Sequence, residues 1–384
     1  MKYKTAESVT LGHPDKLSDY IADSILDACL AQDPESRVAC EVMLSHEVMM
    51  VAGEITTKAK VDYQAIAEAA IEEAGYEPPE SYVDDIVEQS PDIKQAVDEG
   101  ETKELGAGDQ GVMYGYSTDE TIDHLPLPCS IAHRITNKLT KIGRDYGLGP
   151  DGKAQVTVAY GDSDCFHHIE TVLVSVQHEE AMSLEEVQKI VTEKVIEPIL
   201  ADFQSNPKAK IIINPSGRFV LGGFRADTGL TGRKLMVDTY GGLARHGGGA
   251  MSGKDPSKVD RSGAYMARYV ANTVVEAGLA EKCEVSIAYA IGQAKPVMVE
   301  VDTYGTWNYV PDRYIAEAVK KVFDFTPASI IKTLNLKHTA YKETAAFGHF
   351  GLHRKLSWEN PSREKEAELR RALKEVVSDA HEIR

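Results

Sequence analysis

A glycine-rich stretch from Gly247 to Ser262, GGGAMSGKDPSKVDRS, has nearly the spacing of a nucleotide-binding P-loop. It contains G-x-x-x-x-G-K ending at Lys254, but Asp255 stands where a P-loop has Ser or Thr. The following proline disfavours helical backbone at Asp255, and GGLARH separates the glycines from the strand-like run KLMVDTY. The stretch therefore predicts either another kind of phosphate cradle, backed by Lys254 and Lys258, or a flexible surface loop.

Basic residues gather around this stretch, although the 384-residue chain has a net charge of −18 and a pI of about 5.2. Between residues 211 and 268, nine Lys and Arg oppose four Asp, a net charge of +5 that leaves −23 for the rest. The acidic total argues against nucleic acid and anionic membranes as partners. A basic island in an acidic protein suits a small polyanion, unless it is only a solvated surface.

The segment GHPDKLSDY contains a second candidate site, with His13 directly before Pro14 and Asp15. Proline is favoured in the first turn of a helix, and an acidic residue there complements the helix dipole. His13 and Asp15 are thus either a plain helix cap or an anion and metal site at a helix N-terminus.

Two carboxylates, Glu41 and Glu54, interrupt otherwise apolar strand-like runs, and the alternation does not decide whether they face solvent or a site. Asp109 in GAGDQG and Asp227 before GLTGRK are turn residues by default. Neither glycine motif fits G-x-G-x-x-G after a strand, so a Rossmann dinucleotide site is not supported.

The order of elements repeats three times as helix, hairpin and helix. The first copy runs from KLSDYIADSILDACLAQ to YQAIAEAAIEEAG, the second from SIAHRITNKLTKIGRDYG to SLEEVQKIVTEKVIEPIL, and the third from AYMARYVANTVVEAGLAEK to DRYIAEAVKKVFD. Local hairpins favour mixed or antiparallel sheets with helices on one face, an α+β class of two-layer units. Candidate boundaries are residues 98–111 and 213–224.

The five cysteines are widely spaced without a C-x-x-C pair, which predicts neither a disulfide framework nor a zinc site. The N-terminus has no apolar signal region, and no apolar run reaches the length of a membrane span. We therefore expect a reduced, cytoplasmic protein.

Taken together, GHPDK, GEITT, QSPDI, GAGDQG, INPSGRFV, GLTGRK, VDTYGG, SGKDPSKVDRS and KETAAFGHFG closely resemble the S-adenosylmethionine synthetase (methionine adenosyltransferase) family, over nearly the whole chain. The resemblance implies three pseudo-threefold-related domains, at 1–95, 107–220 and 221–384, with a mobile gating loop at 96–106. It also implies a homotetramer, a dimer of dimers with active sites at the dimer interface. The reaction would convert ATP, L-methionine and water to S-adenosylmethionine, phosphate and pyrophosphate, the sulfur attacking C5′ and the whole triphosphate leaving before its hydrolysis.

The resemblance also implies roles for single residues, each matched through its motif. The catalytic set would be His13, Lys153, Arg233 and Lys254. ATP contacts would come from His13, Asp151, Lys153, Arg218, Phe219, Asp227, Arg233, Lys234, Ala250 and Lys254. Methionine contacts would come from Glu54, Gln89, Asp109, Asp227 and Lys258. Two Mg²⁺ ions would bind through Asp15 and Asp260, and K⁺ through Glu41. A leaving triphosphate gains negative charge, which explains the need for preorganised cations.

The chain departs from the family pattern at Leu11, Ala96 and Met251, in FRAD before GLTGRK, and in a shortened segment at 76–91. These changes affect loops and fit and remove no charged catalytic position. Two rival interpretations are a phosphotransferase that attacks the γ-phosphate, which the failed P-loop disfavours, and a non-catalytic nucleotide-binding regulatory subunit of the same fold.

Overall fold

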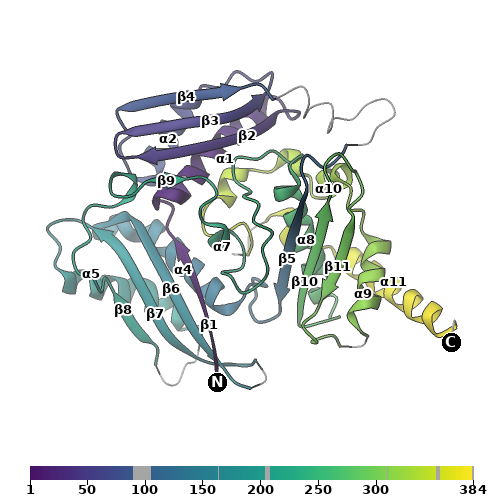
Figure 1. Cartoon of the computed structure of the whole chain (residues 1–384). Coiled ribbons are helices and arrows are strands. Elements are labelled where there is room, and N and C mark those ends of the chain that lie inside the picture. The colour runs from purple at the N-terminus through teal and green to yellow at the C-terminus, as the bar shows by residue number, and fades with distance from the viewer. Residues whose placement is uncertain (90–104, 163, 204–207, 309, 352–354, 383–384) are drawn as a thin grey trace.

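The computed structural model describes residues 1–89, 105–162, 164–203, 208–308, 310–351 and 355–382. Three β-sheets lie on different sides of the molecule, and helix α7 (Leu235–Asp238) with the segment that follows it lies between them (Figure 1). Each sheet is backed by helices, so the α+β class with antiparallel and mixed sheets is confirmed. Among the described residues, no helix combines the length and apolar character needed to cross a membrane.

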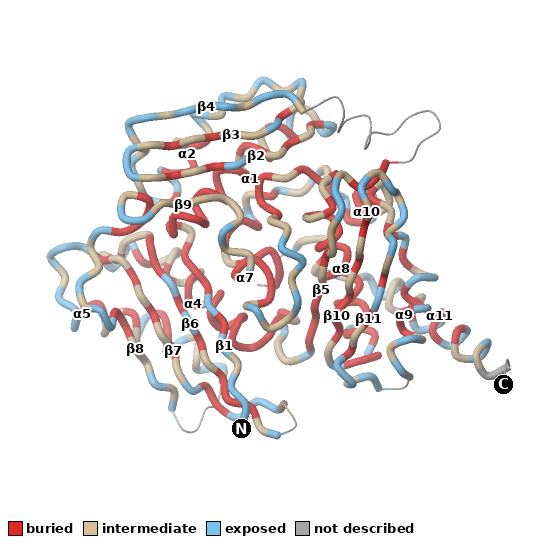
Figure 2. Tube along the Cα trace, viewed as in Figure 1, coloured by how far each residue is buried: buried red, intermediate tan, exposed pale blue. Residues whose placement is uncertain are grey.

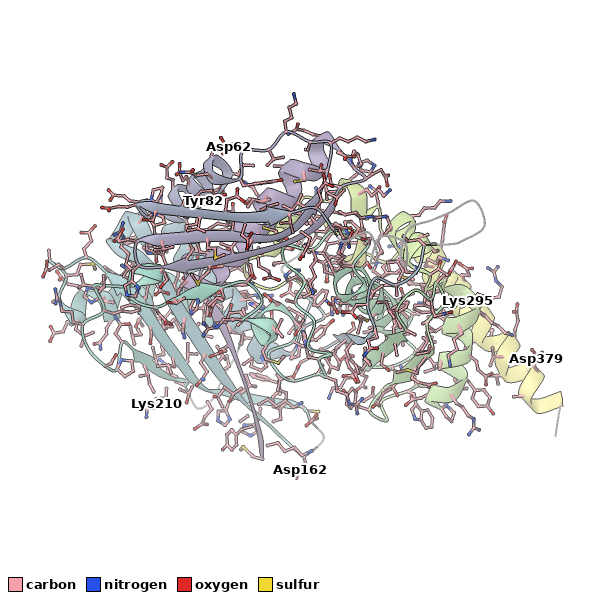
Figure 3. All side chains as sticks on the ribbon, turned by 45° about the horizontal axis from the view of Figure 1, so that its top comes forward. Asp62, Tyr82, Asp162, Lys210, Lys295 and Asp379 are labelled. Carbon is pink, nitrogen blue, oxygen red and sulfur yellow. The ribbon has the colours of Figure 1, made fainter. Side chains whose placement is uncertain are left out.

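The N-terminal sheet has the strand order β4-β3-β2-β9 and is covered on one face by helices α1 and α2. Strands β2 and β3 form the predicted antiparallel hairpin, whereas β4 pairs with β3 in parallel. The bounds are α1 Pro14–Gln32, β2 Arg37–Ser45, β3 Val48–Thr56, α2 Tyr63–Ala74, β4 Ser81–Val87 and β9 Gly229–Leu230. Figure 3 turns this sheet toward the viewer and marks Tyr82 on its edge strand β4.

The central sheet has the order β1-β6-β7-β8, with helix α4 packed on β1 and β6. Its long β6–β7 hairpin is antiparallel, and β8 pairs with β7 in parallel. A capping box at Ser183 starts a helix that passes through a π-helical turn at Val191–Ile196. The bounds are β1 Lys2–Val9, α4 Leu127–Ile142, β6 Leu148–Tyr160, β7 Phe166–His178, α5 Leu184–Ile190, α6 Glu197–Leu200 and β8 Lys210–Ile213.

The C-terminal sheet has the order β11-β10-β5, with helix α8 packed against β5 and β10 and helix α9 against β11. Helices α10 and α11 contact α8, and α11 runs outward to the C-terminus (Figure 1). The bounds are β5 Gly111–Thr118, α8 Val259–Glu276, β10 Lys282–Tyr289, β11 Met298–Asp302, α9 Asp312–Val322, α10 Pro327–Thr333 and α11 Arg363–Glu382.

Every sheet contains a strand from a distant part of the chain. β1, at the N-terminus, joins the central sheet, β5 joins the C-terminal sheet, and β9 joins the N-terminal sheet through Met43 and Leu230. No local pattern in the sequence indicates these exchanges. The structural units therefore interlock along the chain, and the predicted domain limits at 95, 107, 220 and 221 stay a prediction.

The core separates into two clusters of buried side chains. Figure 2 colours the buried residues red along the chain. One lies within the central sheet and its helices, and the other runs continuously through the N-terminal and C-terminal layers. One expected element is wrong: residues of the strand-like run KLMVDTY form the short helix α7, Leu235–Asp238, and a turn. The predicted gating loop at 96–106 lies outside the described residues except for Leu105 and Gly106.

Candidate active site

His13 is the N-cap of helix α1. Its backbone is extended, and its ring Nδ1 accepts a hydrogen bond from the backbone N–H of Asp15 at 3.2 Å. Pro14 follows in the first turn, where its missing N–H has no cost. The capping interpretation of GHPDK is therefore correct in geometry, and it also buries the imidazole at the start of the helix, where the dipole is positive.

Several cations surround the imidazole of His13. Burial lowers the pKa of His13 to about 3, and the ammonium groups of Lys234 and Lys153 add to this shift. Lys153 lies on β6, opposite Val9 of β1. At neutral pH the ring is therefore neutral and able to hydrogen-bond with one nitrogen as donor and one as acceptor.

Asp15 ties the segment GLTGRK to the start of helix α1. Its carboxylate accepts hydrogen bonds from the backbone N–H of Leu230 at 3.0 Å and from Nζ of Lys234 at 2.5 Å. Nε of Arg233 lies 3.7 Å from the same carboxylate. Burial opposes ionisation of Asp15, but the bonds from Lys234 and Leu230 outweigh it and lower the pKa. Asp15 is thus held as a carboxylate among cations.

The stretch SGKDPSK is not a P-loop. It lies beside strand β2, where the carbonyl of Gly253 accepts a hydrogen bond from Cys40 N–H at 2.9 Å. Lys254 forms an isolated antiparallel β-bridge with Ala39. Gly253 has φ +78°, and a Cβ there would lie 2.1 Å from the carbonyl oxygen of Cys40, so only glycine fits. The loop is thus fixed by backbone pairing, with a short irregular link before helix α8.

Asp255, at the position of the missing P-loop hydroxyl, has a structural role. Its buried carboxylate accepts hydrogen bonds from Val38 N–H at 2.8 Å and Ser257 N–H at 2.9 Å. Nζ of Lys258 donates to it at 2.8 Å. Burial opposes ionisation, but Lys258 and these hydrogen bonds lower the pKa of Asp255. The carboxylate therefore fastens the loop to β2.

Lys254 and Asp260 form a partly exposed ion pair beside this loop, with Nζ 2.7 Å from Oδ2. Asp260 lies in the first turn of α8, and a Cβ at Gly249 would come within 2.2 Å of its Oδ1. A Cβ at Gly232 would lie 2.8 Å from the Cβ of Ala250. The glycine stretch therefore touches the GLTGRK segment within one chain.

Glu41 and Glu54 lie on the outward face of the N-terminal sheet. Cys40, Val42 and Leu44 point into the core, so Glu41 faces the other way, and its carboxylate accepts a hydrogen bond from the hydroxyl of Thr231. In the hairpin register Glu54 is opposite Ala39, which places it on the same face as Glu41. The structure thus shows that both carboxylates face away from the core of their own chain.

Models of the S-adenosylmethionine synthetase family match all three parts of the chain. The N-terminal domain model matches residues 1–99, the central domain model 104–219, and the C-terminal domain model 221–360. The chain belongs to the S-adenosylmethionine synthetase family. The resemblance inferred from the motifs is therefore confirmed.

Curated relatives agree over almost the full length. The chain is 46% identical over 413 residues to the S-adenosylmethionine synthase of Thermosynechococcus vestitus (strain NIES-2133 / IAM M-273 / BP-1), covering 97% of this chain and 98% of the relative. It is 49% identical over 374 residues to S-adenosylmethionine synthase 1 of Rhodopseudomonas palustris (strain BisB18), covering 94% and 97%. Similarity at this level extends across all three sheets.

The remaining candidates of this synthetase-family chain include Asp151, which lies near Lys153 and Asp227. Asp151 is buried and accepts a hydrogen bond from Gly223 N–H at 2.8 Å, and burial raises its pKa. Arg218 is exposed and pairs with Glu180 at 2.5 Å. Three other candidates form local hydrogen bonds: Phe219 N–H donates to Nε2 of His178, Gln89 N–H donates to the hydroxyl of Thr56, and Gln110 N–H donates to the carboxylate of Asp109. Asp227 is exposed.

The structure thus brings together two groups of predicted residues. The first surrounds the start of α1 and contains His13, Asp15, Lys153, Arg233 and Lys234. The second lies at the start of α8 and contains Ala250, Lys254, Lys258 and Asp260. Within the part of the chain that the structure describes, no cluster of three or more His, Cys, Asp or Glu could hold a metal ion.

Sequence reasoning missed a set of buried charged residues that hold these loops. They are Lys16, Asp19, Asp23, Asp238 and Arg261, all with side chains almost or fully removed from solvent. Asp15, Asp19 and Asp23 recur every fourth residue, so they occupy one line along α1. That spacing is visible in the sequence. If this face of the helix is buried, its carboxylates need cations or N–H donors as partners.

Proposed function

We propose that the chain is a methionine adenosyltransferase, which makes S-adenosylmethionine, phosphate and pyrophosphate from ATP, L-methionine and water. The observation that carries the proposal is the cationic environment of a neutral, buried His13 at a helix N-terminus, in a chain of this family. Lys153, Arg233 and Lys234 supply positive charge next to it. Such preorganised charge favours a triphosphate leaving group in the transition state.

In this proposal the sulfur of methionine attacks C5′ of ATP, the C5′–O bond breaks, and the electron pair leaves with the triphosphate. The thioether has no proton to lose, so the step needs no general base. In this proposal a ring N–H of the neutral His13 donates a hydrogen bond to the departing oxygen. Lys254 and Arg233 bind the phosphates until the triphosphate is hydrolysed. The other ATP contacts proposed are Asp151, Arg218, Phe219, Asp227, Lys234 and Ala250.

Two Mg²⁺ ions fit the carboxylates of Asp15 and Asp260, because oxygen ligands and a partial protein cage are what Mg²⁺ prefers beside phosphates. Each carboxylate pairs with a lysine, at 2.5 Å from Lys234 and 2.7 Å from Lys254. Those lysines can turn to phosphate, which frees the carboxylates. Bound Mg²⁺ would supply charge neutralisation of the triphosphate. The carboxylate of Glu41 with the hydroxyl of Thr231 offers oxygen ligands suited to K⁺.

The methionine contacts proposed are Glu54, Gln89, Asp109, Asp227 and Lys258. A dimer of dimers with sites at the dimer interface is supported by the outward face of the N-terminal sheet. That face carries Glu41 and Glu54, and the edge strand β4 exposes Val83 and Val87 there. Exposed apolar residues on a sheet are typical of an interface between subunits. A cytoplasmic location stays a prediction of the sequence.

One incubation with ATP, L-methionine, Mg²⁺ and K⁺ tests the reaction, with mass spectrometry and assays for phosphate and pyrophosphate. We expect a sulfonium product with equal amounts of phosphate and pyrophosphate. ADP without a sulfonium product would instead identify a phosphotransferase. ATP binding without turnover would identify a non-catalytic nucleotide-binding subunit.

A further inference from the structure

A line of four carboxylates on helix α1 holds backbone segments from three distant parts of the chain. Asp15, Asp19, Asp23 and Asp27 are each four residues apart and therefore share one face of the helix. Every one accepts hydrogen bonds from backbone N–H groups, those of Leu230, Gly232, Gly253, and Tyr341 with Lys342, respectively. These carboxylates of helix α1 thus fix the position of loops from distant parts of the chain.

Asp19 is the member of this line next to the cationic loop. Its side chain is fully buried, and Oδ1 accepts the hydrogen bond from Gly232 N–H at 2.9 Å. Oδ2 pairs with Nζ of Lys16 at 2.8 Å. Lys16 in turn pairs with Asp238, the last residue of α7. The charges of Lys16, Asp19 and Asp238 are therefore all removed from water and depend on one another.

This buried group determines where the segment Gly232–Asp238 lies. On its N-terminal side the chain is fixed by pairing of β9 with β2, and Gly232 follows two residues after the end of β9 at Leu230. Gly232 has φ +71°, a conformation that glycine adopts without strain. Arg233 and Lys234 follow immediately, so a hydrogen bond at Gly232 sets the origin of both cationic side chains.

We propose that Asp19 is a positioning residue, which places Arg233 and Lys234 for ATP through its hydrogen bond to Gly232 N–H. The inference rests on the proposed function only in taking ATP as the ligand. An asparagine at this position keeps an oxygen for Gly232 and leaves Lys16 in a neutral pair with Asp238. The two carboxylates outnumber the single lysine, and burial with Asp238 nearby raises the pKa of Asp19 to about 7. Asp19→Asn is therefore the conservative variant, because it keeps an oxygen acceptor for Gly232 N–H. Asp19→Ala removes that acceptor.

The test compares Asp19→Ala and Asp19→Asn with Asp27→Ala and Asp27→Asn, matched controls on the same line that hold a different segment. The dissociation constant of ATP with Mg²⁺ is measured by calorimetry, and KM for ATP and kcat by product assay. We expect Asp19→Ala to weaken ATP binding about tenfold, a loss typical of one buried hydrogen bond. Asp19→Asn should stay within about threefold, and both Asp27 variants should bind as the unaltered chain does.

Equal effects of Asp19→Ala and Asp27→Ala on ATP binding would overturn the proposal, as would unchanged binding in Asp19→Ala. If Asp19→Ala does not fold, Asp19→Asn against Asp27→Asn decides, and equal dissociation constants would again overturn it. The binding measurement needs no turnover. A chain that binds ATP but makes no sulfonium product would thus refute the proposed function while the Asp19 comparison still stands or falls independently.

Discussion

Substitution of Asp23 by Asn tests how firmly the SGKDPSK loop is held. Asp23 and Arg261 form a bidentate ion pair, in which Nη1 lies 2.8 Å from Oδ1 and Nη2 lies 2.7 Å from Oδ2. Neither side chain is exposed to solvent. Asp23 also accepts from Gly253 N–H at 2.8 Å, and Arg261 donates to the carbonyl of Lys254 at 2.9 Å. The pair therefore holds two consecutive residues of the loop.

The expected cost follows from burial. Removing one partner of a fully buried pair costs about 3–5 kcal/mol, because the other charge stays in the interior without compensation. Asn keeps an oxygen for Gly253, and Arg261 retains its position over the ring of Tyr341, 4.2 Å from the centroid. We therefore expect a loss of about 3 kcal/mol for Asp23→Asn and about 5 kcal/mol for Asp23→Ala.

A native fluorophore reports on this site. Trp358 is fully buried and stacks on Tyr265 at 3.8 Å, and Tyr265 accepts a hydrogen bond from Nε of Arg261 at 3.1 Å. Urea unfolding followed by tryptophan fluorescence gives the free energy of unfolding for Asp23→Asn, Arg261→Gln and the double variant. We expect a coupling energy of about 2 kcal/mol. Strictly additive losses of unfolding free energy, or a loss below about 1 kcal/mol for Asp23→Asn, would refute the conclusion that Asp23 and Arg261 form a buried, desolvated ion pair.

Four further predictions concern single positions. Lys254→Met should lower kcat about 100-fold or more in the product assay, since it removes a cation from the leaving group; an unchanged kcat would place the lysine outside the reaction. Glu41→Gln should abolish stimulation by KCl while the rate without K⁺ stays similar, and a retained K⁺ response would move that ion elsewhere. Gly253→Ala should cost more than about 2 kcal/mol of unfolding free energy in urea, because the residue has positive φ and the new Cβ meets the Cys40 carbonyl. Burial raises the pKa of Asp27 from 3.8 to about 6, so between these pH values the folded state keeps a proton that the unfolded state has lost. The free energy of unfolding should therefore fall by up to about 3 kcal/mol as pH rises from 4 to 6. A difference in unfolding free energy between Asp27→Asn and the unaltered chain that does not vary with pH would contradict this.

Local features of the molecule could be predicted from the sequence. The cap at His13, the hairpin of β2 and β3 and the long helices α1 and α8 depend on residues close in the chain, so periodicity and turn residues reveal them. The failure of the P-loop was also readable, because Asp255 and the proline after it exclude the required turn and helix.

Features that depend on distant partners could not be predicted. β9 is only two residues long and pairs with β2, which precedes it by nearly two hundred positions. Strand β5 reads as an ordinary extended segment, and nothing local indicates that it joins β10. The role of Asp255 likewise depends on Val38, a partner far away in the chain. Pairing at such distances is decided by packing of whole layers, which a single sequence does not display.

The candidate site separates two tasks that carboxylates perform. Asp19 and Asp23 are buried, and each binds a backbone N–H together with a buried cation, so exchange of partners would leave an interior charge uncompensated. The pair of Lys254 and Asp260 is different, since its side chains are 21% and 25% exposed, so that in the proposed function phosphate and metal would replace its partners at small cost. Loops that must receive a highly charged ligand thus keep their backbones fixed through permanent ion pairs, while their outer ion pairs remain exchangeable. Rigid placement and exchangeable charge are both conditions for stabilising a leaving triphosphate.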